Sequence, residues 1–177
     1  MSEVSERASI IVQLANFAAV DGSGMGNVLG SGANIFPLTP NGMTPRFTVF
    51  TEIHVPADIC PCEVAVEYSL RDEKGDVVEV AGPMPQSLRI ANIMTIDAGL
   101  AGLPLDQRNH IGAVSLGTLD FSNGLALAPG NYSWRVTLDG DDEHAAERLF
   151  CVPKPVTLLY LGKSDISGML RPAYRLG

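Results

Sequence analysis

The sequence predicts an all-β protein, an antiparallel β-sandwich of jelly-roll or immunoglobulin-like type, in a chain of 177 residues. Strand-forming runs recur about every ten residues, the spacing typical of sandwiches and barrels. Gly (18) and Pro (12) are scattered as turns between these runs and do not gather into a low-complexity tract. No segment carries the sustained period of a long helix. We therefore expect many short strands joined by turns.

Each run ends in turn residues. Predicted strands, in chain order, cover 9–20, 25–36, 46–55, 62–70, 77–80, 87–96, an extended pair over 111–127, then 133–138 and 148–152. The first run ends in Asp21-Gly22-Ser23-Gly24, which predicts a turn and a return strand. Segment 97–110 contains two Gly and one Pro without a usable period, and it is predicted as a long loop.

Two segments indicate which side chains face the core. In Arg46–Val55, Phe47, Val49 and their alternate neighbours share one face, while Phe50 makes the other face only partly polar. The run 62–70 turns at 71–76 into 77–80 as a hairpin. Same-face positions predict a core that includes Val64, Val66, Tyr68, Trp134 and Val136. Tyr132 shares the face of Trp134, next to Pro129-Gly130, in the manner of the tyrosine corner of sandwich domains.

The charge of the chain excludes several partners. The net charge is −8, which opposes binding to nucleic acid or to anionic lipid. No run is long enough to span a bilayer, and the first residues carry acids where a signal peptide has bases. Three cysteines are too few for a disulfide scaffold, and we interpret them as reduced thiols. We expect a cytoplasmic origin, with no nucleic acid and no membrane as partner.

Candidate chemical sites are weak. Ser115 lies in a loose nucleophile-elbow pattern, but no helix is predicted after it. Gly22–Gly32 fits no phosphate-binding motif and is better explained by turns and bulges. A zinc site from His54, Cys60, Cys62 and Cys151 departs from zinc-finger spacing, since one residue separates Cys60 from Cys62. The acidic run 139–143 lacks a calcium-loop pattern and fits a solvated hairpin tip. We therefore expect no enzyme activity, no cofactor and no metal.

Four motifs occur in order along the chain: Ala18-x-x-Asp21-x-x-Gly24-x-x-Asn27-Val28-Leu29-Gly30, Pro45-x-Phe47, Asp72-Glu73-x-Gly75 and Pro129-Gly130-x-Tyr132. With these motifs the chain, from Ile10 to Val152, resembles a family of β-rich proteins found in actinobacteria and their phages. The resemblance implies a β-rich fold and a phage or actinobacterial setting. It implies no catalytic residue.

The last residues differ from the rest. We divide the chain into an N-terminal arm (1–8), a sandwich domain (9–153) and a C-terminal extension (154–177). The extension has a net charge of +3 and the rest −11, together the −8 of the chain. Its prolines and glycines oppose one amphipathic helix, so an extended arm that docks on a neighbour is expected. The predicted partner-binding residues are Leu158, Tyr160, Lys163, Met169, Arg171, Tyr174 and Arg175. The extension packing back as a last strand of its own domain is the alternative.

Two classes of function fit these observations. The first is a non-enzymatic structural protein, most concretely a phage virion component such as a capsid-decorating or minor capsid protein. Its partners would be other copies of itself, a major capsid protein, or both. Sparse charge and the excess of nine Arg over three Lys favour this class, since interfaces are enriched in Arg and depleted in Lys. The alternative is a bacterial β-sandwich binding module for a small ligand or carbohydrate.

Overall fold

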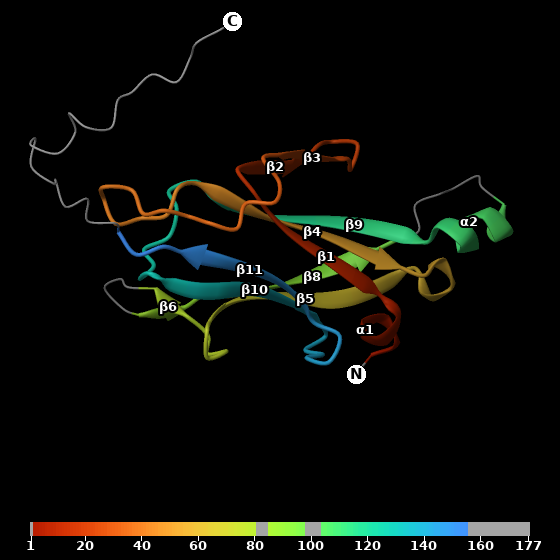
Figure 1. Ribbon diagram of the computed structural model, residues 1–177. Coiled ribbons are helices and arrows are strands. Elements are labelled where there is room, and N and C mark those ends of the chain that lie inside the picture. The colour runs from red at the N-terminus through yellow and green to blue at the C-terminus, as the bar shows by residue number, and fades with distance from the viewer. Residues whose placement is uncertain (1, 81–84, 98–103, 156–177) are drawn as a thin grey trace, which may run out of the picture.

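The computed structural model describes residues 2–80, 85–97 and 104–155 and confirms an antiparallel all-β sandwich (Figure 1). A three-stranded sheet has the order β1-β4-β9, and a four-stranded sheet has the order β11-β10-β5-β8. The strands are β1 Ser9–Ala15, β4 Phe47–Val55, β5 Cys62–Asp72, β8 Arg89–Ile96, β9 Ala113–Phe121, β10 Gly130–Leu138 and β11 Ala146–Val152. The chain changes sheet between β4 and β5, β8 and β9, and β9 and β10, so the connectivity is immunoglobulin-like.

Smaller elements decorate this frame. They are the hairpin of β2 Phe17–Val20 with β3 Gly26–Leu29, the pair β6 Glu79–Val80 and β7 Gln86–Ser87, and the helices α1 Glu3–Arg7, η1 Ala57–Ile59 and α2 Leu105–Ile111. The β2–β3 hairpin lies over the outer face of the three-stranded sheet (Figure 1). In the described part of the chain, no helix has the length and apolar character needed to cross a membrane.

Aromatic rings fill the space between the two sheets. Trp134 is fully buried, and its ring centroid lies 5.2 Å from that of Phe121. Phe47 stacks on Phe121 at 5.0 Å, while Phe36 packs edge-on against Phe150 at 5.4 Å. All five core residues predicted from alternation, among them Val64 and Val136, are buried. The prediction of the inward faces of β5 and β10 is confirmed.

A tyrosine corner fixes the entry into β10. The Tyr132 hydroxyl donates a hydrogen bond of 2.8 Å to the carbonyl oxygen of Ala128, four residues earlier. Its ring stacks on Phe150 at 5.6 Å, so the side chain is nearly buried. This contact confirms the corner predicted next to Pro129-Gly130.

One polar contact crosses between the sheets in the core. The hydroxyl of Tyr68, on β5, lies 2.8 Å from Oγ1 of Thr51, on β4, and both side chains are buried. Gly117, on β9, makes room for this contact, because a Cβ atom there would lie 2.5 Å from the Tyr68 hydroxyl and 2.6 Å from Thr51 Oγ1. The glycine in β9 is therefore required by a close approach of side chains.

Three predicted strands are wrong in extent. The run 9–20 splits after β1, because β2 leaves the sheet and pairs with β3. The run 25–36 keeps only β3 as a strand, followed by a single parallel bridge of Ile35 with Cys151. The pair predicted over 111–127 is the single strand β9, after which Leu125 exchanges hydrogen bonds with Thr44. The return strand predicted after Asp21-Gly22-Ser23-Gly24 is confirmed as β3, which pairs with β2. Partners distant in the sequence take the other backbone hydrogen bonds that neighbouring runs were expected to receive, because β1 pairs with β4 and Ile35 bridges to Cys151.

Two other local predictions are corrected by the structure. Helix α2 covers residues 105–111, although 97–110 was predicted as a loop and 111 as the start of a strand. Pro104 precedes the helix and Gly112, at φ 74°, ends it. These breakers mark the start and stop of a short helix. The return strand predicted at 77–80 is only the two-residue β6, and β5 pairs along most of its length with β8 and β10.

The N-terminal residues are held against the domain. Ser2 and Ser5 form a reciprocal capping box at the start of α1, and Val4 is buried. Arg7 binds Asp58 at 2.8 Å, and the Ser2 hydroxyl donates to the carboxylate of Asp139. The segment expected as an N-terminal arm thus contains a short helix packed on one end of the sandwich.

The β10–β11 hairpin tip, expected to be solvated, contains a buried carboxylate. Asp141 accepts backbone hydrogen bonds from Glu143 at 2.9 Å and His144 at 3.4 Å, and its other oxygen lies 3.0 Å from His144 Nδ1. The bond to His144 is the main cause that lowers the pKa of Asp141 to about 2, with further help from the Ser5 hydroxyl of α1. The same bond raises the pKa of His144. The pair therefore stabilises the tip in charged form, and the Ser5 hydroxyl joins Asp141 to α1.

We expect Trp134→Ala to destabilise the protein by about 3–5 kcal/mol, because it leaves a cavity between the sheets. Trp134→Phe is the matched control and should cost less, since the ring contact with Phe121 is largely kept. Urea denaturation at one pH measures both. An unchanged midpoint for Trp134→Ala would place the indole outside the core.

We expect Gly117→Ala to destabilise the protein by about 1–3 kcal/mol through overpacking against Tyr68 and Thr51. Gly22→Ala, where an added Cβ meets no atom within 4 Å, is the control and should be close to neutral. Thermal unfolding of the two variants, compared with the unchanged chain, makes the measurement. Equal melting temperatures for both variants would contradict the close approach.

We expect the stability contributed by the His144–Asp141 pair to be greatest between about pH 4 and 6.5. The His144 contribution is lost as pH rises through its raised pKa, and the Asp141 contribution is lost as pH falls through about 2. His144→Gln should therefore remove a fall in melting temperature on going from pH 6 to 9. His110→Gln, on α2, should keep that fall, and an identical pH profile for both variants would contradict the assignment.

Candidate functional site

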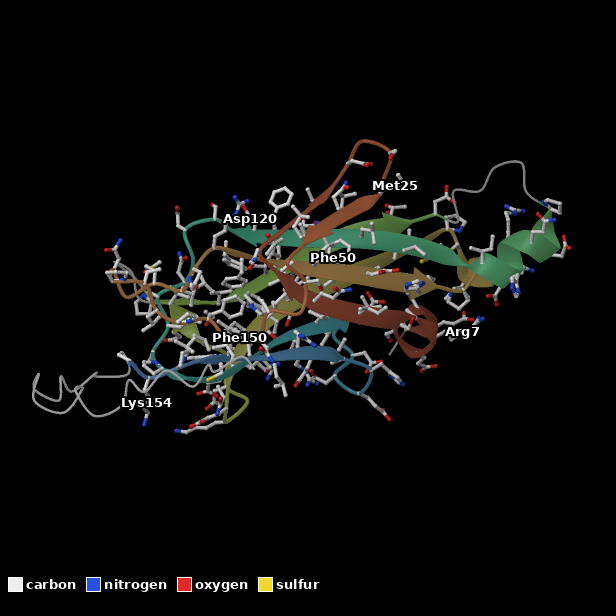
Figure 2. All side chains as sticks on the ribbon, turned by 45° about the horizontal axis from the view of Figure 1, so that its top comes forward. Arg7, Met25, Phe50, Asp120, Phe150 and Lys154 are labelled. Atoms are coloured by element: carbon white, nitrogen blue, oxygen red, sulfur yellow. The ribbon has the colours of Figure 1, made fainter. Side chains whose placement is uncertain are left out.

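The seven residues predicted to bind a partner, from Leu158 to Arg175, all lie outside the described residues. The structure describes only the first two residues of the extension, Lys154 and Pro155. Lys154 lies at one end of the sandwich and Arg7 at the other (Figure 2). The extension therefore leaves the domain at the end opposite to helix α1.

The four residues considered for zinc do not come together. Cys60 follows helix η1 and Cys62 begins β5, whereas Cys151 pairs with Asn131 at the other end of the same sheet. His54 Nε2 lies 2.7 Å from the carboxylate of Glu52. Burial is the main cause that raises the pKa of the Cys60 thiol to about 11, which disfavours the thiolate that a metal would need. Within the described ranges, no group of three or more metal-ligating side chains is found.

Ser115 is placed as a strand residue. It lies in β9 directly opposite Ile53 of β4, and the strand continues for six residues beyond it to Phe121. A nucleophile elbow needs a sharp turn from a strand into a helix. The geometry at Ser115 is not that of an elbow.

A hollow of about 550 Å³ lies on the outer face of the four-stranded sheet, near the end of β11. Charged and polar side chains, including Arg71, Arg135 and Glu147, line it together with Leu149. Tyr132 and Phe150 also border it, but both are buried in the stacked pair described above. Neither ring therefore presents an exposed face on which a sugar could stack.

The β2–β3 hairpin carries exposed apolar side chains. Phe17 and Leu29 lie directly opposite each other in the pairing of the two strands and therefore share a face. Leu29 is 66% exposed, as is Met25 at the turn, and Val20 is also exposed. Val20 pairs with Gly26 and lies on the opposite face of the hairpin. We call Phe17, Met25 and Leu29 the hairpin face. Apolar residues that gather on one projecting element are typical of a protein-interaction surface.

The underside of the hairpin is fixed to the sheet. Phe50 on β4, expected on the outer face, is only 4% exposed because the hairpin covers its ring. A Cβ at Gly26 would lie 2.9 Å from that ring, so β3 rests directly on it. Figure 2 shows the hairpin, with Met25, over Phe50. Arg46 lies over the Phe17 ring at 5.3 Å and also pairs with Asp120 at 3.2 Å.

A second apolar surface follows strand β8 at the edge of the four-stranded sheet. Ile93, on the outer face, is 71% exposed, and Ile90 is also exposed. Ile90 and Met94 border a hollow of about 390 Å³ between β8 and β9, with Tyr68 and Leu119 on its other walls. This hollow marks the side of the sandwich where β8 of one sheet lies next to β9 of the other.

Sequence reasoning missed both surfaces. For the hairpin face the available signal was Phe50, an aromatic residue on a face that would otherwise be polar. For β8 the signal was the run Arg89–Ile96, which is apolar at both odd and even positions and contains one charged residue. Neither pattern predicts which element covers these apolar residues or leaves them exposed, because that depends on distant parts of the chain.

No family model matches the chain, and no curated protein matches it. Among solved structures, a crystal structure of beta-glucosidase from Listeria innocua in complex with gluconolactone is similar, with a TM-score of 0.38 and 11% identity. The similarity covers 84% of this chain and spans 16% of the length of that enzyme. A likeness of this size supports no inference about activity. The class of protein is therefore defined by its own structure, an immunoglobulin-like β-sandwich domain with two exposed apolar surfaces.

Proposed function

We propose that the protein is a non-enzymatic structural component of a phage virion, a capsid-decorating or minor capsid protein that binds a shell through protein–protein contacts. The observation that carries the proposal is the hairpin face. Three large apolar side chains are presented by an element whose other side is fixed to the sheet through Phe50. A rigid projecting apolar surface loses little conformational entropy when it docks on a partner.

The resemblance to β-rich proteins of actinobacteria and their phages supports the virion setting. Its first motif, Ala18 to Gly30, is the hairpin itself. Low charge supports docking on another protein, since charged residues are depleted at interface cores. The partners in this proposal are a major capsid protein and other copies of the chain, the latter engaged through the extension from Leu158 to Arg175.

Mass spectrometry of purified virions, from cells that carry the gene and produce phage, tests this function. We expect the chain in fixed proportion to the major capsid protein. We expect Leu29→Lys to reduce co-sedimentation of the protein with shells about tenfold or more, because it places a charge in an apolar contact. Leu105→Lys, at a comparably exposed position on α2, is the control and should co-sediment normally.

Absence of the chain from virions, together with no co-sedimentation at any concentration, would overturn the proposed function. Equal losses for Leu29→Lys and Leu105→Lys would place the contact outside the hairpin face. Circular dichroism of both variants checks that each is folded.

A further inference from the structure

The edges of the two sheets differ in how they are covered. The edge of β11 is occupied by the segment before Phe36, because the Cys151 amide donates to Asn34 at 2.8 Å and the Phe36 amide donates to Cys151 at 2.9 Å. At the edge of β1, the Gly32 amide donates to the carbonyl oxygen of Leu14 at 3.0 Å. Among the described residues, no strand pairs with the far side of β8.

Strand β8 also lacks the features that normally protect an edge. Edge strands in native proteins usually carry lysines, prolines, bulges or inward-pointing charges, which prevent pairing with another chain. β8 pairs with β5 without a break from Arg89 to Ile96, so it has no bulge, and it contains neither Lys nor Pro. Its one charged residue, Arg89, binds Glu67 on β5 at 2.7 Å. The edge is therefore able to accept a further strand.

A strand added at this edge would meet apolar side chains on both of its faces. Ala91 and Ile93 of β8 pair with residues of β5 that point outward, so they lie on the outer face of the sheet. Ile90 and Met94 of β8 pair with residues of β5 that point inward, and both border the hollow between β8 and β9. The added strand would thus need apolar residues at successive positions, as buried strands have.

We propose that the run Val156–Leu161 of a second copy of this chain adds to the free edge of β8 as an antiparallel strand. This inference rests on the proposed function, and it names the site at which one copy engages the next. The run reads Val-Thr-Leu-Leu-Tyr-Leu, with apolar residues on both alternating faces and no charge, Gly or Pro. Backbone hydrogen bonds would supply the pairing, and the hollow beside β8 would receive alternate side chains.

The occupant is a second copy because the run cannot lie fully along β8 of its own chain. The described chain leaves the sheet at Val152, at the end of β11, and β11 is at the opposite edge of the sheet from β8. The free side of β8 lies four strand spacings away, about 19 Å. The four residues from Val152 to Val156 cover at most about 14 Å. The run of a second copy is not tied to this β11 strand, so this distance does not prevent it from reaching the free side of β8.

The charges beside β8 favour one direction of the added strand. Lys154 and Lys163 flank the run. At the Ile96 end of β8 are the acidic residues Asp97 and Glu63, the latter on β5 opposite Thr95. An antiparallel strand brings Lys154 of the second copy to this acidic end. Charge would set the direction, and apolar burial would supply most of the affinity.

Complementation between two variants tests the proposal with the full chain. Ile93→Lys damages the acceptor edge and keeps the run, whereas Tyr160→Asp damages the run and keeps the edge. Light scattering coupled to size exclusion is expected to show concentration-dependent association of the unchanged chain, weakened about tenfold or more in each variant. Leu149→Lys, on β11 and 69% exposed, is the matched control for Ile93 and should associate normally.

An equimolar mixture of the two variants should form heterodimers, because one intact run and one intact edge remain in each pair. Hydrogen exchange should protect the β8 amides in the mixture in the chain that carries Tyr160→Asp, and not in the chain that carries Ile93→Lys. Variants that fail to recover on mixing, or β8 amides that exchange at the same rate with and without association, would overturn the strand addition.

The two proposals fail in different ways. If Tyr160→Asp abolishes association and Ile93→Lys does not, the extension engages a copy elsewhere and the β8 site is wrong, while the proposed function stands. If the unchanged chain is monomeric at every concentration and its β8 amides are protected by its own extension, the second copy is wrong. The proposed function would still be decided by the co-sedimentation of the protein with shells, which depends on the hairpin face and not on β8.

Discussion

The burial of aromatic rings between two sheets is the constraint on which the rest of the structure depends. Trp134, Phe47 and Phe121 fill the centre, and the inward faces of both sheets must alternate to reach them. The Tyr68–Thr51 contact joins the sheets at a point where a buried hydroxyl must find a partner. Strand register is thereby fixed, since a slip by one residue would turn every inward side chain outward.

Local signals were sufficient for the interior of the long strands. Alternation in 46–55 and 133–138 placed β4 and β10, and the Pro-Gly-x-Tyr motif placed the corner. The local pattern did not predict which strands pair with each other, because pairing depends on contacts between segments that are distant in the sequence. The hydrogen bonds that join Thr44 to Leu125, or Asn34 to Cys151, have no counterpart in local pattern.

The same dependence on distant segments holds for the candidate sites. Of the cysteines considered as zinc ligands, only Cys60 and Cys62 are close in the sequence, and the structure separates Cys151 from both along the sheet. The two exposed apolar surfaces could not be predicted from the sequence, because the exposure of a side chain depends on which elements cover it in the folded protein. Phe50 is buried by the β2–β3 hairpin, which lies earlier in the chain, whereas Ile93 of a similarly apolar strand is left exposed.

The positions of the two ends of the sandwich have a mechanical consequence. β1 begins at the end held by helix α1, and β11 runs toward the end at which Lys154 lies (Figure 2). Tension applied between these ends therefore pulls along the strands. Hydrogen bonds between strands lie across that direction, so the β1–β4 ladder from Ser9 to Ala15 is loaded in shear as a unit. A domain built in this way resists being opened one bond at a time, which suits a domain that is stretched between its two ends.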